Sequence, residues 1–314
     1  MSAGASVLGI DTSCYTTSSA LARNGQIVAF ERKLLPVPGG ARGLRQSEAV
    51  FTHVKQLPEV LEAVLRDAGQ VGAICVSAKP ADDADSYMPV FMTGLGFARS
   101  LSAALHVPLF TTTHQRGHIR AALIGTGMPE GDMLTVHLSG GTTDVLKVQG
   151  GRIERIGCSL DLHAGQLVDR VGVAMGLPFP AGPSLEALAK DAKAPCARLK
   201  ASTEGTNCHL SGAETQLRAL LDAGLPKADA AMEIYDLLSR TLLKMLSAAR
   251  DSTGLSRVLI AGGVASSEIL RNLMRERNAR RRLGLEIFFG NPKYCSDNAA
   301  GVALIGEEKW LGGI

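Results

Sequence analysis

Apolar and polar positions along the chain follow two periods, and their order predicts an α/β protein. Short apolar or alternating runs are typical of strands, whereas apolar residues three or four positions apart are typical of helices. Leu57, Leu61 and Val64 show the helical spacing. The first part of the chain contains predicted strands at 6–11, 19–23, 26–35 and 71–77 and predicted helices at 47–68 and 89–105. This order is that of a ribonuclease-H-like unit.

A second unit of the same kind is predicted from residue 107 onward. Its strands are expected at 109–113, 133–138, 144–149, 152–158, 257–260 and 285–289, and its helices at 163–175, 232–253, 268–280 and 297–310. One more helix, directly after the strand at 109–113, carries two histidines. We therefore predict two tandem ribonuclease-H-like domains with a central cleft, 1–106 completed by a C-terminal helix at 298–314, and 107–297.

Composition and charge narrow the class of protein. With 314 residues and 46% hydrophobic content, the chain can bury two cores. Aromatic residues make up 4%, which argues against the stacking surface of a single-strand nucleic-acid binder. The net charge of +3 is too small to identify a nucleic-acid binder, although it allows a local basic patch. The six cysteines form no CxxC pair, and no apolar run is long enough to span a membrane, so we expect a soluble, reduced, cytoplasmic protein.

His114 and His118 form the most informative pair of polar residues. Residues four positions apart lie on one face of a helix, so two imidazole nitrogens can bind the same metal ion. An isolated pair with this spacing is also compatible with two surface or helix-capping histidines that bind no metal. Glycine-rich turns and an acidic loop with Asp297 near the C-terminus favour the metal interpretation. Asp297 by itself is equally suited to cap the helix that follows it.

Three glycine-rich turns follow predicted strands. Backbone N–H groups in such turns bind phosphate. The turns are 9–13, which also offers the Asp11 carboxylate, 139–143 and 261–264. A single glycine pair in a hairpin is usually structural, but three turns at equivalent places in tandem units predict a nucleotide site. Asp169, in the middle of a predicted helix, is compatible with a ribose contact or with a solvated surface.

With these residues placed, the chain resembles the TsaD/Gcp family of tRNA threonylcarbamoyladenosine synthases, formerly described as glycoproteases. Motif blocks of the family match in order over nearly the whole length. The matching blocks are 9–14, 114–118, 139–141, 165–183, and 262–265 followed by 296–300. The resemblance implies the actin and sugar-kinase (ASKHA) fold, which agrees with the tandem units that the pattern predicts.

The resemblance also implies a metal site and most of a nucleotide site in the 107–297 domain. His114, His118 and Asp297 would bind one iron or zinc ion. An adenine nucleotide (threonylcarbamoyl-AMP, ATP or AMP) is expected at residues drawn from the turns and the resemblance together. These residues are Asp11, Ser139, Gly140, Gly141, Thr142, Thr143, Asp169, Gly182, Gly262, Gly263 and Ser267.

The implied reaction joins a threonylcarbamoyl group to tRNA. The exocyclic amine of the adenosine next to the anticodon attacks the carbamoyl carbon of threonylcarbamoyl-AMP, and AMP leaves. The metal would act as a Lewis acid on the phosphate and carbonyl oxygens. The implied partners are tRNA and either TsaB-like and TsaE-like proteins or a second copy of the chain, with no membrane involved.

The chain departs from the family pattern where nucleotide and acceptor contacts are expected. Thr142 replaces a histidine or asparagine, and Ser267 replaces an asparagine. An acidic segment, Ala78–Asp85, replaces a Gly-Pro-Gly turn, and Gln166 stands where bacterial members have glutamate. The predicted metal ligands are retained. A divergent paralogue that uses the same site for another acceptor is therefore an alternative hypothesis.

Two other functions are compatible with parts of the pattern. A carbamoyl-type transferase for a small molecule or a protein thiol would need carbamoyl phosphate and a separate adenylating domain, which this chain lacks. A nucleotide-binding regulatory scaffold has no use for a metal triad. A metalloprotease is disfavoured, because no HExxH glutamate accompanies the histidines.

A basic cluster follows the turn at 261–264. It consists of Arg271, Arg275, Arg277, Arg280, Arg281 and Arg282. Such a cluster is compatible with a solvated helix face or with a surface that binds the tRNA backbone.

Overall fold

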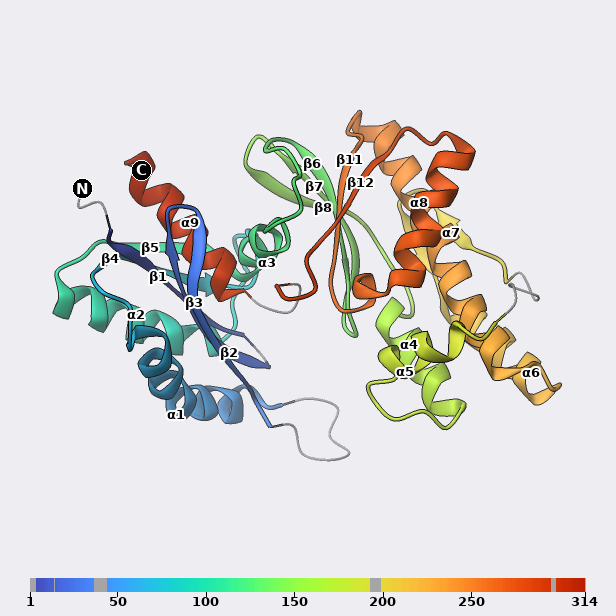
Figure 1. Cartoon of the computed structure of the whole chain (residues 1–314), viewed down its shortest axis with the longest axis horizontal. Helices are drawn as coiled ribbons and strands as arrows, with labels where there is room; N and C mark the ends of the chain where they lie inside the picture. Colours follow the sequence, from blue (N-terminus) through green and yellow to red (C-terminus); the bar gives the residue numbers. More distant parts are fainter. Residues whose placement is uncertain (1–3, 14, 37–43, 193–198, 295–297, 314) are drawn as a thin grey trace. The chain divides into compact units, whose positions relative to one another are not determined.

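The computed structural model describes residues 4–13, 15–36, 44–192, 199–294 and 298–313. The chain forms two compact units: the first comprises Met1–Ile124 and Ser296–Ile314, and the second comprises Gly125–Cys295. Each unit is built on a five-stranded sheet with helices packed against it (Figure 1).

The sheet of the first unit has the strand order β3-β2-β1-β4-β5. Its strands are β1 (Ser6–Thr12), β2 (Thr16–Arg23), β3 (Gln26–Leu34), β4 (Val71–Lys79) and β5 (Leu109–Thr113). The first three strands pair antiparallel, whereas β4 runs parallel to β1 and β5 runs parallel to β4. The central strand β1 is buried along its whole length, as its apolar sequence predicts.

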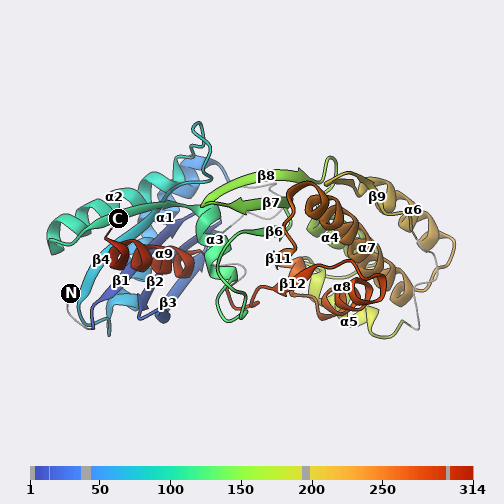
Figure 2. The ribbon, with the colours of Figure 1, turned by 90° about the horizontal axis from the view of Figure 1, so that it is seen from above.

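Helices cover both faces of this sheet (Figure 2). α1 (Gln46–Leu65) and α2 (Val90–Leu105) lie on one face, where Leu57 and Ile10 belong to the same apolar cluster. α9 (Ala299–Gly312) lies on the other face, so close to β1 that a Cβ atom at Gly9 would come within 2.5 Å of the Ala303 nitrogen. Successive residues of a strand point to opposite faces, so β1 serves both layers.

The helix with the two histidines, α3 (His114–Ala122), packs tightly against α9. A Cβ atom at Gly301 would overlap the carbonyl oxygen of Gly117, and one at Gly117 would lie 3.0 Å from Val302. Two glycines thus allow the two helix backbones to approach each other.

This close approach predicts opposite effects of alanine at two helical glycines. Gly301→Ala should destabilise the protein by about 1–3 kcal/mol, because the new methyl group meets backbone that cannot yield. Gly96→Ala should stabilise it by up to about 1 kcal/mol, since Gly96 is exposed in α2 and a Cβ atom there meets nothing within 4 Å. Thermal unfolding of both variants checks this. A Gly301→Ala protein as stable as wild type would contradict the α3–α9 packing.

The sheet of the second unit repeats the topology of the first. Its order is β12-β11-β6-β7-β8. The strands are β6 (Met133–Leu138), β7 (Thr143–Gln149), β8 (Arg152–Cys158), β11 (Arg257–Ala261) and β12 (Glu286–Phe289). Again three antiparallel strands come first in the chain, and two strands parallel to the first of them follow. The two tandem ribonuclease-H-like units predicted from the sequence therefore share one strand order.

The long helix α7 (Lys227–Thr253) forms the centre of the second unit's helical layer. It packs on β6 and β7 and contacts the surrounding helices and the small hairpin. These elements are α4 (Ala164–Ala174), α5 (Gly182–Ala189), β9 (Ser202–Glu204), β10 (Asn207–His209), α6 (Ser211–Asp222) and α8 (Glu268–Arg281). No helix in the described ranges is long and apolar enough to cross a membrane.

The boundary between the units differs from the one placed at residue 106 from the sequence. The first unit continues to Ile124, because β5 pairs with β4 and α3 packs on α9. The histidine helix therefore belongs to the first unit and not to the 107–297 domain. The local pattern identifies β5 as a strand but does not show which sheet it joins.

Candidate functional site

The two histidines lie side by side in the first turns of α3. The helix begins at His114, and the Thr113 side chain caps it by accepting a hydrogen bond from the backbone N–H of Arg116. The ring centroids of His114 and His118 are 4.5 Å apart, with an angle of 71° between the ring planes. The four-residue spacing thus brings the two imidazoles together on one face, as the sequence predicts.

Asp11, at the end of β1, lies beneath His114. Its buried carboxylate is 3.0 Å from His114 Nδ1 and accepts hydrogen bonds from the Ser77 hydroxyl and from Asn298 Nδ2. Burial by itself raises the pKa of Asp11, but the neighbouring His114 and the three side-chain hydrogen bonds outweigh it and hold the pKa below its ordinary value. An ionised carboxylate 3.0 Å from Nδ1 orients the imidazole. Asp11, expected among the nucleotide ligands, is thus placed behind a predicted metal ligand.

One buried polar group beside His114 is of a kind that a nearby cation would satisfy. Asp297, the third predicted ligand, lies outside the described residues, and within the described ranges no three His, Cys, Asp or Glu side chains are grouped to hold a metal. Asn298, the next residue, places its amide Nδ2 2.6 Å from His114 Nδ1 and 3.2 Å from His114 Nε2. Its Oδ1 is buried and has no hydrogen-bond partner in the described part of the chain. A buried oxygen without a donor is a group that a nearby cation would satisfy.

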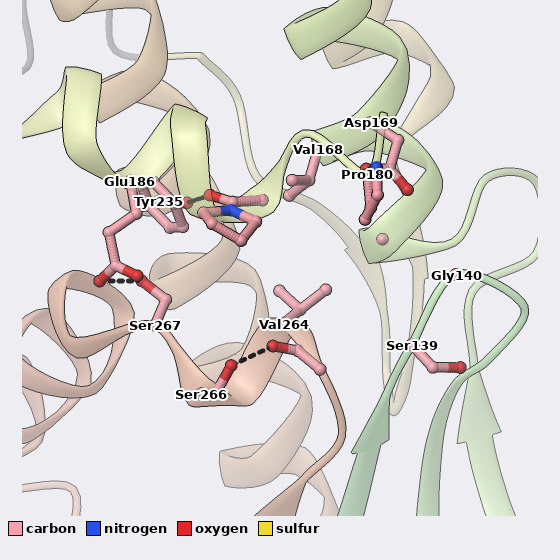
Figure 3. Close-up of a pocket in the computed structure, with 14 residues that line it drawn as sticks. Ser139, Gly140, Val168, Asp169, Pro180, Glu186, Tyr235, Val264, Ser266 and Ser267 are labelled. Atoms are coloured by element: carbon pink, nitrogen blue, oxygen red, sulfur yellow. Dashed lines mark hydrogen bonds between the residues drawn. The ribbon is translucent and has the colours of Figure 1, made fainter. Parts of the chain in front are cut away.

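The second unit contains a pocket of about 410 Å³ (Figure 3). This volume lies within the range of small-molecule sites, about 300–1,000 Å³. The walls come from the β6–β7 turn, α4, the start of α5, α7 and the turn after β11. The lining residues are Ser139, Gly140, Gly165, Val168, Asp169, Pro180, Gly182, Pro183, Glu186, Tyr235, Gly263, Val264, Ser266 and Ser267.

Two glycines bring these walls together. A Cβ atom at Gly165 would come within 2.6 Å of the Gly140 nitrogen, so the start of α4 can lie directly on the β6–β7 turn only without a side chain there. Gly262 has φ +105°, and a Cβ atom there would overlap the Leu138 carbonyl. By contrast, apart from its chain neighbours, no atom lies within 4 Å of a Cβ atom built at Gly140. On that side the Gly140 backbone is accessible to a ligand.

Two carboxylates and a hydroxyl supply the polar chemistry of the pocket. Ser267 caps α8 and donates its hydroxyl to Glu186 Oε1 at 2.9 Å, and the Ile269 N–H donates to the same oxygen at 3.1 Å. Asp169 Oδ1 accepts a hydrogen bond from the Ala181 N–H at 2.8 Å. Among the described residues, each carboxylate is held through only one oxygen. The second oxygen of each can accept a hydrogen bond from a ligand hydroxyl or amine.

The predicted nucleotide-binding residues divide into two groups. Those that line the pocket are Ser139, Gly140, Asp169, Gly182, Gly263 and Ser267. Gly141, Thr142 and Gly262 neighbour these residues along the chain but do not line the pocket. Thr143 is buried, and its Oγ1 accepts a hydrogen bond from the Ala164 N–H at 2.8 Å, which fixes the start of α4.

Sequence reasoning missed several residues of the pocket, above all Glu186 and Tyr235. Glu186 follows Gly182 by four residues, which is one turn of α5, so the helical period could have indicated it. Tyr235 lies on α7, and its hydroxyl donates to the Gly182 carbonyl at 3.4 Å across 53 residues of sequence. No local pattern marks that contact.

The basic cluster on α8 is smaller than the sequence suggests. Arg271 donates to the carbonyl oxygens of Ala265 and Gly290, so it holds the turn after β11. Arg277 forms an ion pair with the buried Asp236 of α7. Neither side chain is available as part of a solvated basic face. Arg275 is exposed with its guanidinium group over the Phe289 ring, and Arg280, Arg281 and Arg282 are exposed at the end of the helix.

Comparison with known proteins identifies one family. The family model described as "TsaD: tRNA N6-adenosine threonylcarbamoyltransferase" matches residues 40–304. A protein named tRNA N6-adenosine threonylcarbamoyltransferase, from Carboxydothermus hydrogenoformans, is 31% identical over 322 residues, which cover 99% of this chain and 94% of that protein.

Two solved structures with the same architecture have low sequence identity to this chain. Component A of (R)-2-hydroxyglutaryl-CoA dehydratase from Acidaminococcus fermentans has a TM-score of 0.55 at 18% identity and covers 97% of this chain and 98% of its own. A ROK family glucokinase from Streptomyces griseus, in complex with glucose and AMPPNP, has a TM-score of 0.55 at 12% identity, with 96% and 98% covered. At these identities the likeness shows the fold alone, which is the ASKHA fold.

Proposed function

Because this chain belongs to the tRNA N6-adenosine threonylcarbamoyltransferase family, we propose that it transfers the threonylcarbamoyl group of threonylcarbamoyl-AMP to tRNA. The acceptor is the exocyclic amine of the adenosine next to the anticodon. The observation that carries the proposal is the family match over residues 40–304, supported by a relative of the same name at 31% identity. The chain is accordingly a transferase.

The adenylate part of the substrate is proposed to bind in the second-unit pocket. Val168 and Val264 offer apolar surface for a base, and the second oxygens of Asp169 and Glu186 can accept hydrogen bonds from ribose hydroxyls or an amine. The open backbone at Gly140 is suited to phosphate oxygens. The apolar surface, the carboxylates and the open backbone thus correspond to the base, the ribose and the phosphate of a nucleotide.

A metal ion, iron or zinc, is proposed at His114 and His118, with Asp297 as the third ligand. Such an ion would supply Lewis acidity to the carbonyl and phosphate oxygens. The surrounding residues of this chain fix the orientation of the metal-binding side chains. Asp11 keeps the His114 ring oriented through Nδ1, and α9 packs against α3.

We also propose that the chain works in the cytoplasm with a protein partner, either TsaB-like and TsaE-like proteins or a second copy of itself. Large apolar side chains exposed on α1 and α2 support an association surface there. They are Phe51, Val54 and Met92, with exposed fractions of 65%, 46% and 49%.

The activity is tested by complementation of cells depleted of their own family member. Mass spectrometry of tRNA nucleosides should detect restored threonylcarbamoyladenosine. Its absence from cells that contain folded protein and the partner proteins would overturn the proposed acceptor. It would favour the divergent paralogue that the substitutions at Thr142 and Ser267 suggest.

Binding of tRNA should depend on salt through the arginines at the end of α8. Replacing Arg280, Arg281 and Arg282 by serine should reduce the slope of log K against log salt by about 0.7–0.9 for each phosphate that these arginines neutralise. Filter binding of unmodified tRNA at several salt concentrations measures the slope. Arg66→Ser with Arg99→Ser, at exposed positions of the first unit, is the control. Equal slopes for the triple variant and wild type would place the tRNA elsewhere.

A further inference from the structure

The acidic segment after β4 folds into a compact turn. Lys79 Nζ donates to the carbonyl oxygens of Asp82 and Asp83 at 3.1 and 3.0 Å. The Ala81 N–H donates to the Ser86 hydroxyl at 3.0 Å. This turn falls in the segment Ala78–Asp85, where the sequence departs from the Gly-Pro-Gly of the family pattern.

The turn is attached to the first turn of the histidine helix. Asp82 accepts hydrogen bonds from Arg116 through both oxygens, with Nε 2.9 Å from Oδ1 and Nη2 2.6 Å from Oδ2. The Thr113 hydroxyl donates to Asp82 Oδ1 at 3.2 Å, and the Gln115 N–H donates to the Pro80 carbonyl at 2.9 Å. The first N–H groups of a helix have no acceptor within the helix, so the Pro80 carbonyl supplies one that Gln115 would otherwise lack. A two-point arginine–carboxylate pair also restricts orientation more than a single contact does.

These contacts hold α3 from a side that the imidazoles do not use. Arg116 is two residues from both His114 and His118, and residues two apart on a helix do not face each other. Asp11 contacts the His114 ring, and α9 packs at Gly117. The ion pair with Asp82 is therefore an additional restraint on the rotation of α3 about its own axis.

We propose that Asp82 is a positioning residue, which sets the direction of the two imidazoles by bracing the first turn of α3. It also compensates the positive charge of Arg116 near a bound dication. This inference rests on the metal site proposed above. It assigns to that site a residue that does not coordinate the metal.

Co²⁺ titration of the apoprotein, followed by visible absorption, tests the proposed positioning role of Asp82. Asp82→Asn should weaken Co²⁺ binding about tenfold, the lower end of the effects seen for residues that orient ligands, and should alter the ligand-field bands. Hydrogen exchange of the α3 amides, measured without metal, should accelerate in the same variant. Asp83→Asn is the matched control, because Asp83 holds its neighbours in the turn through its carbonyl oxygen, which the substitution leaves in place. Exchanging the pair, Asp82→Arg with Arg116→Asp, should restore binding in part.

Each result decides a separate question. Unchanged Co²⁺ affinity and spectrum in Asp82→Asn would overturn the positioning role of Asp82. An equal loss of Co²⁺ affinity in Asp83→Asn would overturn it as well. If wild-type protein binds no Co²⁺, the proposed metal site is wrong, and amide exchange alone decides whether Asp82 restrains α3. Unchanged exchange would then overturn the proposal.

Discussion

His118→Ala should reduce the metal content of the purified protein from about one ion per chain to nearly none. Three protein ligands are typical of a catalytic metal site, and losing one imidazole leaves too few to retain the ion through purification. Elemental analysis of both proteins, purified in parallel, measures the effect. The backbone should be undisturbed, because alanine is the best helix former and His118 lies inside α3.

A histidine outside the site provides the control for this experiment. His106 caps the C-terminal end of α2 with φ 53°, a conformation that asparagine also tolerates, so His106→Asn removes one imidazole without backbone strain. We expect full metal content in His106→Asn. Equal metal in wild type and His118→Ala would contradict the assignment of His118 as a ligand.

Gly182→Leu should abolish nucleotide binding while leaving the fold intact. Gly182 lines the pocket at the first residue of α5, its φ is not positive, and the nearest atom to an added Cβ is Val168 Cγ1 at 3.9 Å. A leucine side chain can therefore be accommodated locally but would occupy the space proposed for the nucleoside. We expect the affinity for AMP or ATP, measured by calorimetry, to fall at least about 100-fold, since each 1.4 kcal/mol of binding free energy is a factor of ten.

The same substitution elsewhere in the second unit separates blocking from destabilisation. Gly212 is exposed in α6, and nothing lies within 4 Å of an added Cβ atom. Gly212→Leu should bind nucleotide as wild type does. If Gly182→Leu retains full affinity and an unchanged melting temperature, the nucleotide does not occupy this pocket.

The pattern of the sequence predicted the main strands and helices of both units. Strand β1 and helix α7 follow from their own apolar periods, because burial on one face or both is reflected in consecutive residues. The spacing of His114 and His118 likewise places their rings together, since one turn of helix connects them. Short-range geometry therefore determined the elements and the histidine pair.

Contacts between distant segments were decided only by the tertiary structure. Asn298 and Asp11 are 287 residues apart, yet they meet at His114, and Asp82 reaches Arg116 over 34 residues. The cluster of arginines in the sequence made Arg277 a candidate for tRNA binding. In the structure, α7 lies beside α8, and Arg277 forms an ion pair with the buried Asp236 of α7. The periodic spacing of apolar and polar residues shows which face of its helix or strand a side chain occupies. The partner on that face depends on how the sheet brings other elements beside it, and no local pattern carries that information.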